Sequence, residues 1–141
     1  MRAITKKAIL EYDMDVIGIK DGYEGLIHNQ YRSLSYDDVS GILTLGGTIL
    51  GTTNKANPFH YAVKDGNQVK YKDLSKKVLQ NIEELDIECL VCIGGDGTLW
   101  VSHRLYQEGI PVIGVPKTID NDIRGTDITF GFNTAVSIAT E

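Results

Sequence analysis

The sequence predicts an α/β fold in which helices cover both faces of a parallel β-sheet. Two strand–loop–helix units carry this prediction. Apolar runs at residues 89–93 and 112–115 are each followed by a glycine-rich or polar loop and then by a helical pattern. Nearly continuous apolar strands in such units are typical of parallel sheets that are buried on both sides. No internal repeat or low-complexity linker interrupts the chain, so we expect residues 1–141 to form a single Rossmann-like domain.

Each element is expected from its local pattern. Apolar residues at three- and four-residue spacing predict helices at 2–12 and 74–85. The last helix is expected to begin near Asn133. Pro111 and Pro116 bound the second strand, where a missing ladder donor is tolerated. The other elements expected before residue 88 are a strand at 15–19, a turn at 21–25, a short helix at 37–39 capped by Ser35, a glycine-broken apolar stretch at 43–54 and an irregular stretch at 55–72.

Composition excludes several classes of protein. Hydrophobic residues make up 42% of the chain and charged residues 23%, which fits a globular protein and excludes a disordered or collagen-like one. The formal net charge is -5 and no basic cluster stands out, which argues against nucleic acid as a partner. No apolar stretch is long enough to cross a membrane, and no signal peptide begins the chain. We therefore expect a cytoplasmic protein.

The two cysteines, Cys89 and Cys92, have a spacing that also occurs in redox and zinc sites. Both belong to the first apolar run. Residues three apart on a strand point to opposite faces, so their sulfur atoms are poorly placed to share a metal ion or a disulfide. We interpret them as two core thiols of a reducing compartment.

The loop after the first strand consists of Gly94, Gly95, Asp96, Gly97 and Thr98. Glycines let a phosphate approach the backbone, and the amides at the start of the following helix favour anions. The aspartate would repel phosphate unless a magnesium ion lies between the carboxylate and the phosphate oxygens. The pentapeptide therefore indicates a magnesium–phosphate site. The structural alternative is a glycine-rich turn in which Asp96 caps the helix.

The loop after the second strand carries Lys117, Thr118, Asp120 and Asp122. Ligands of open parallel sheets bind beyond the carboxyl ends of the strands, so we expect the two loops to lie side by side. Carboxylates close to a cation and a hydroxyl suit a base that takes a proton from an attacking alcohol. Alternatively, the two aspartates cap the next helix and Lys117 is a solvated charge. The two loops together favour phosphoryl transfer.

The same loops, with the sequences GGDGT and PKTIDND, resemble those of the 6-phosphofructokinase family. The segments DGYEGL at 21–26, GGTILG at 46–51 and GTD at 125–127 also resemble family segments and occur in the expected order. The resemblance spans essentially the whole chain. It implies an ATP-dependent enzyme that moves the γ-phosphoryl group of MgATP to the 1-hydroxyl of fructose 6-phosphate, giving fructose 1,6-bisphosphate in glycolysis.

The resemblance also implies roles for individual residues. The aspartate that matches Asp120 is the catalytic base of the family, and the one that matches Asp96 binds magnesium. Thr118 would contact the sugar phosphate and the phosphoryl group in transfer, while Asp122 would help to organise the loop. The implied substrate-binding residues are Thr118, Ile119 and Asp120. The implied ATP-binding residues are Asn54, Lys55, Gly95, Asp96, Gly97 and Thr98.

The resemblance implies ATP rather than pyrophosphate as the phosphoryl donor. Pyrophosphate-dependent members carry aspartate at the position of Gly97, where its side chain would obstruct the α-phosphate of a nucleotide. Lys117 points the other way, because many ATP-dependent members have glycine there and pyrophosphate-dependent members have lysine. We expect Gly97 to decide, by steric exclusion. NAD kinases and diacylglycerol kinases share the GGDGT loop, but they lack the PKTIDND segment.

Three departures from the family pattern bear on activity. The chain begins after the strand and phosphate loop that open the family's fold, so the sheet is expected to lack its first strand. Where many ATP-dependent members have an arginine, this chain has Asn54 followed by Lys55, which would supply a point charge. The half that supplies most sugar-phosphate ligands is also missing. We therefore expect an incomplete domain that is inactive by itself. The resemblance implies that the full-length enzyme is a homotetramer or homodimer. The alternative is a non-catalytic nucleotide-binding fragment.

Overall fold

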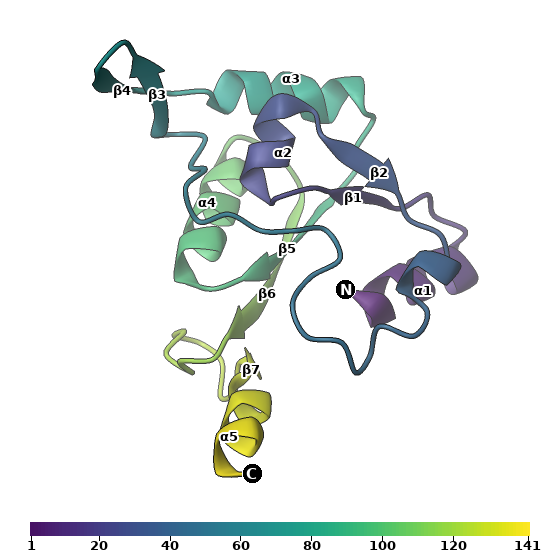
Figure 1. Cartoon of the computed structure of the whole chain (residues 1–141). Coiled ribbons are helices and arrows are strands. Elements are labelled where there is room, and N and C mark those ends of the chain that lie inside the picture. Colours follow the sequence, from purple (N-terminus) through teal and green to yellow (C-terminus); the bar gives the residue numbers. More distant parts are fainter. The chain divides into compact units, whose positions relative to one another are not determined.

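The structure, a computed structural model, describes residues 1–141 and divides into two compact units, Met1–Leu85 and Asp86–Glu141. The prediction of a single domain stays a prediction. Each unit contains helices and strands, as Figure 1 shows. No helix has both the length and the apolar character that a membrane span requires.

The first unit contains two small antiparallel sheets. It begins with α1 (Arg2–Tyr12), which confirms the first predicted helix. β1 (Ile17–Ile19) pairs antiparallel with β2 (Tyr31–Ser33), and α2 (Tyr23–His28) connects them. A single 3-10 turn, η1 (Asp37–Val39), follows. β3 (Tyr61–Asp65) and β4 (Gln68–Lys72) form a hairpin, and α3 (Ser75–Glu84) ends the unit.

The core of the first unit lies between α2 and α3, which appear side by side in Figure 1. Ile27 of α2 and Val78 of α3 are fully buried. The side-chain amide of the buried Asn81 donates hydrogen bonds to the carbonyls of Leu26 and Ile27, at 2.7 and 3.1 Å, and so joins the two helices. The other buried apolar side chains of this unit are Leu26, Leu34, Val39, Ala56, Pro58 and Ile82.

The predicted cap of the short helix at 37–39 takes the form of a reciprocal pair. The backbone N–H of Asp38 donates to Ser35 Oγ at 3.3 Å, while the backbone N–H of Ser35 donates to the Asp38 carboxylate at 2.8 Å. Such a pair satisfies two donors that the turn itself leaves unpaired. The hydrogen bonds from Ser35, with a smaller contribution from the charge of Arg32, hold the pKa of Asp38 below its usual value.

The second unit contains the parallel sheet that the sequence predicts. Its strands are β5 (Leu90–Gly94), β6 (Val112–Thr118) and β7 (Phe130–Gly131), in the spatial order β5-β6-β7. α4 (Asp96–Gln107) packs against β5 and β6 (Figure 1). It buries Val101 and Leu105. α5 (Phe132–Thr140) follows β7 directly, close to the predicted start at Asn133.

Several details of the sequence prediction are wrong. Residues 21–25 do not form a turn only, since α2 begins at Tyr23. The stretch 55–72 is not irregular, because it contains the β3–β4 hairpin. The second strand does not stop at Val115 but continues through Pro116 to Thr118.

The two cysteines are not core thiols. Cys89 precedes β5 and is exposed, and Cys92 is only half-buried. One face of the sheet is exposed: Val91 and Ile113 pair across β5 and β6 and are 40% and 57% exposed. Cys92 belongs to the opposite face, toward α4, because side chains alternate along a strand.

Candidate active site

The glycine-rich loop lies where β5 ends and α4 begins. Gly94 is the last residue of β5, Gly95 has an extended backbone, and Asp96 is the first residue of α4. A Cβ atom on Gly94 would lie 2.4 Å from Oγ1 and 2.6 Å from Cβ of Thr98, far inside normal contact. Glycine is therefore required here because the first turn of α4 packs directly on the end of the strand.

The first turn of α4 offers an anion site with open space beside it. Asp96 and Gly97 are exposed, and α4 runs for 12 residues from this end. A Cβ atom on Gly97 would meet nothing within 4 Å. The first amides of a helix lack partners within the helix and attract negative charge. This end of α4 can therefore receive phosphate oxygens without steric obstruction from position 97.

The second loop places a hydroxyl and a carboxylate together. Thr118, the last residue of β6, donates a hydrogen bond through Oγ1 to Oδ2 of Asp120 at 3.1 Å. The backbone N–H of Asp120 in turn donates to Thr118 Oγ1 at 3.2 Å. Asp120 is exposed and Thr118 is half-buried. The pair therefore presents a carboxylate to solvent while its orientation is fixed from the strand side.

The two loops lie side by side, as the sequence predicts. β5 and β6 pair in parallel, with Gly94 opposite Pro116, so their carboxyl ends meet at the same edge of the sheet. A Cβ atom on Gly95 would lie 3.8 Å from the Cβ of Thr118, in ordinary contact. The helix end that attracts anions and the Thr118–Asp120 pair therefore share one site.

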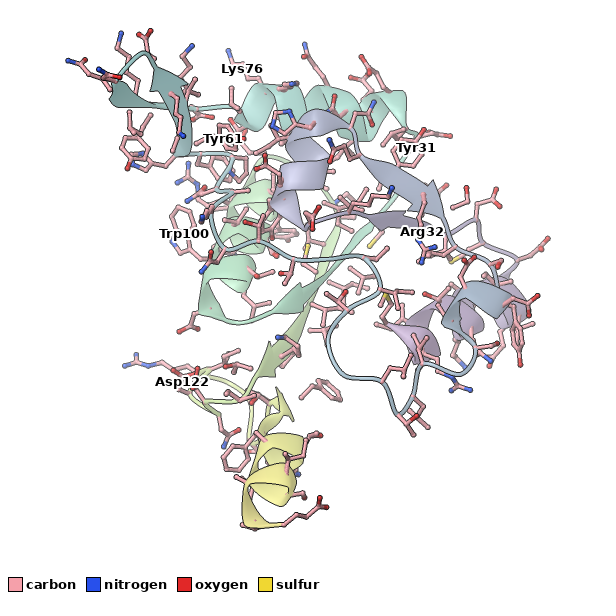
Figure 2. The ribbon with its side chains drawn as sticks, viewed as in Figure 1. Tyr31, Arg32, Tyr61, Lys76, Trp100 and Asp122 are labelled. Carbon is pink, nitrogen blue, oxygen red and sulfur yellow. The ribbon has the colours of Figure 1, made fainter.

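The other residues of the second loop surround this pair. Lys117 is exposed, and Ile119 is 64% exposed. Figure 2 shows Asp122 on the loop that follows β6. Thr129 is 2% exposed, and its hydroxyl donates a hydrogen bond to the carbonyl oxygen of Thr118 at 2.8 Å. The sequence patterns do not single out this residue. No local pattern marks it, because its partner lies 11 residues away.

The carboxylates do not form a metal cage. The chain has no group of three or more His, Cys, Asp and Glu side chains that could hold a metal ion. This donor set fits magnesium bound with a phosphate ligand, because Mg²⁺ usually takes one or two carboxylates together with substrate phosphates and water. Asp96 is the carboxylate at the helix end that favours phosphate.

Comparison with known proteins shows the family of the chain. Residues 1–141, the whole chain, match the family model described as Phosphofructokinase. The chain belongs to the phosphofructokinase family. Among solved structures, Pichia pastoris phosphofructokinase in the T-state is similar with a TM-score of 0.81 and 28% identity, covering 96% of this chain and 15% of that one.

Curated relatives of this phosphofructokinase-family chain are longer than the chain itself. It is 52% identical over 142 residues to ATP-dependent 6-phosphofructokinase 2 of Clostridium perfringens, covering 100% of this chain and 39% of that protein. It is 46% identical over 141 residues to ATP-dependent 6-phosphofructokinase 3 of Bacteroides thetaiotaomicron, covering 100% of this chain and 40% of that protein. The chain thus spans about two fifths of the length of these relatives.

Asn54 and Lys55, the remaining ATP ligands expected from the phosphofructokinase resemblance, lie in the first unit. Both are exposed, and Lys55 lines a pocket of about 450 Å³ together with Asp21, Glu24, Thr53, Tyr61 and Ala62. Tyr61 donates to Oε1 of Glu24 at 2.8 Å, and this hydrogen bond to a carboxylate raises the pKa of Tyr61. The assignment of Asn54 and Lys55 to ATP stays a prediction.

Proposed function

We propose that this chain supplies the MgATP-binding loop and the catalytic base of an ATP-dependent 6-phosphofructokinase. The reaction transfers the γ-phosphoryl group of ATP to the 1-hydroxyl of fructose 6-phosphate, giving fructose 1,6-bisphosphate in glycolysis. The observation that carries the proposal is the Thr118–Asp120 pair beside the amino end of α4. The names of the two curated relatives support it.

The residues of the site divide the chemistry between them. Asp120 accepts the proton of the attacking hydroxyl, since a carboxylate takes up to about four hydrogen bonds and Thr118 uses only part of that capacity. Thr118 and Ile119 contact the sugar phosphate. Gly95, Gly97 and Thr98 receive the donor phosphates at the helix end. Asp96 would hold Mg²⁺, which neutralises charge on the donor phosphates when it is bound.

ATP is the donor that the site favours over pyrophosphate. The open space beside Gly97 supports this choice, because a nucleotide needs room there for its α-phosphate. Lys117 is the residue that a pyrophosphate-dependent enzyme would use, and its exposed position leaves it able to approach a bound phosphate.

By resemblance to family members, we expect the full-length protein to be a homotetramer or homodimer.

The test is a coupled assay with two preparations. Residues 1–141 alone should show no turnover, because most of the family's sugar-phosphate ligands lie outside this segment and the neighbouring subunits are absent from the preparation. A chimera in which residues 1–141 replace the matching segment of the Clostridium perfringens relative should turn over fructose 6-phosphate with ATP, and much less with pyrophosphate. A folded chimera without turnover would refute the proposal, whereas a preference for pyrophosphate would refute the donor alone.

A further inference from the structure

Thr129 is the inward-facing residue of an exposed segment. It is 2% exposed, while its neighbours Ile128 and Phe130 are 55% and 65% exposed. It precedes β7, which pairs with the last two residues of β6. A buried hydroxyl in such a position needs a partner, because an unpaired polar group away from water is destabilising.

The polar groups of Thr129 bond to both ends of the segment 118–121. Its hydroxyl donates to the carbonyl oxygen of Thr118 at 2.8 Å. Its backbone N–H donates to Oδ1 of Asn121 at 2.9 Å, and the hydroxyl lies 3.5 Å from the same oxygen. The segment that carries Asp120 is therefore tied on either side of that residue to one buried residue, through its hydroxyl at Thr118 and chiefly through its backbone N–H at Asn121.

Asn121 explains why this attachment matters for conformation. Its φ angle is +53°, in the left-handed region that most residues avoid and that asparagine tolerates better than most. The hydrogen bond from Thr129 fixes the Asn121 side chain while the backbone holds this angle. Together the two residues define the path of the chain just after Asp120.

We propose that Thr129 is a positioning residue for the Thr118–Asp120 pair. Its hydroxyl holds the carbonyl of Thr118 and its N–H holds Asn121, so the Asp120 carboxylate meets the substrate hydroxyl in a fixed orientation. Thr129 does not itself contact the reacting atoms. The inference rests on the proposed function for its catalytic consequence, whereas the loop conformation can be measured without it.

Two substitutions at residue 129 distinguish the effect of the hydroxyl from the effect of side-chain packing. Thr129→Val keeps the shape of the side chain and removes the hydroxyl, and Thr129→Ser keeps the hydroxyl. Thr126→Val is the matched control, because the Thr126 hydroxyl also bonds a backbone carbonyl, that of Ile128 at 3.1 Å, but not the loop at 118–121. Amide hydrogen exchange of the 141-residue chain reports on the loop, and the coupled assay of the chimera reports on catalysis.

In Thr129→Val we expect exchange at the amides of residues 120 and 129 to become roughly fivefold to tenfold faster, since one net hydrogen bond is lost. In the chimera we expect kcat to fall roughly tenfold to a hundredfold with the KM for ATP unchanged, because misplaced reacting groups reduce rate rather than nucleotide binding. Thr129→Ser and Thr126→Val should both behave like the wild type.

Wild-type kcat in Thr129→Val, or an equal loss in Thr129→Ser, would overturn the inference, because the hydroxyl would then not be what positions the pair. A wild-type chimera without turnover refutes the proposed function instead. In that case the exchange rates decide: faster exchange only in Thr129→Val supports the role of Thr129 in holding the loop, and unchanged exchange overturns it.

Discussion

A methyl group at Gly94 should destabilise the second unit. In Gly94→Ala the new Cβ would lie 2.6 Å from the Cβ of Thr98, an atom that the backbone of α4 fixes and no rotamer change can move. The first turn of α4 must therefore shift away from the end of β5. Overpacking of this kind reduces stability by about 1–3 kcal/mol, and we expect a loss in that range for Gly94→Ala.

Gly97→Ala is the matched control, because its Cβ would meet nothing within 4 Å and the residue lies in the first turn of the same helix. Replacing glycine by alanine in a helix stabilises by up to about 1 kcal/mol, so the two substitutions should act in opposite directions.

Urea denaturation measures both effects. For the 141-residue chain, the urea concentration at the midpoint of unfolding should fall in Gly94→Ala and should stay the same or rise slightly in Gly97→Ala. The slope of the free energy of unfolding against urea concentration should not change. Calorimetric titration with MgATP adds a second measurement, because a displaced helix end should bind phosphate more weakly in Gly94→Ala. If Gly94→Ala unfolds at the wild-type urea concentration, the close approach of Thr98 to Gly94 is not a constraint on the loop, and our explanation for this glycine is wrong.

Three further predictions concern the chemistry and are measured in the chimera. Asp120→Asn should lower kcat by several orders of magnitude with little change in ATP affinity, because the amide cannot accept the hydroxyl proton; retention of most of the kcat would remove Asp120 from the role of base. Asp96→Ala should raise the magnesium concentration needed for half-maximal rate, and an unchanged magnesium titration would contradict a metal contact. Gly97→Asp should reduce kcat/KM for ATP and, with Lys117 present, increase the use of pyrophosphate. An unchanged ratio of kcat/KM for ATP to kcat/KM for pyrophosphate would show that position 97 does not select the donor.

Elements with strong periodicity were predictable from sequence. The helices α1 and α3 follow from apolar spacing, α4 follows from the helical pattern after the first loop, and the parallel pair β5–β6 follows from two continuous apolar runs in strand–loop–helix units. The two chemically distinctive loops were expected side by side because both follow parallel strands. The parallel register, with Gly94 opposite Pro116, confirms that expectation, although the roles of the individual residues stay predictions.

The features that the sequence did not predict correctly have physical causes. The hairpin β3–β4 was read as irregular because all of β4 and most of β3 are exposed, so no apolar face marks them. The start of α2 resembles a turn in sequence because Gly22 and Gly25 lie close together. Gly25 is nevertheless required by packing, since a Cβ atom there would clash with the carbonyl oxygen of Lys20. Thr129 was missed because hydrogen bonds between residues 8 and 11 positions apart leave no local pattern.

The way in which β6 changes partners has a consequence for motion. Its first five residues pair with β5, from Val112 to Pro116, while Lys117 and Thr118 pair with the two residues of β7. The loop at α4 thus rests on a longer ladder than the loop that carries the Thr118–Asp120 pair. Short ladders open at lower free energy than long ones, so local opening should begin at β7 and leave the β5–α4 junction intact. The two sides of the site would then differ in stiffness. Under the proposed function, the rigid side receives the phosphoryl donor, and the side for the acceptor can yield as the sugar enters and the product leaves.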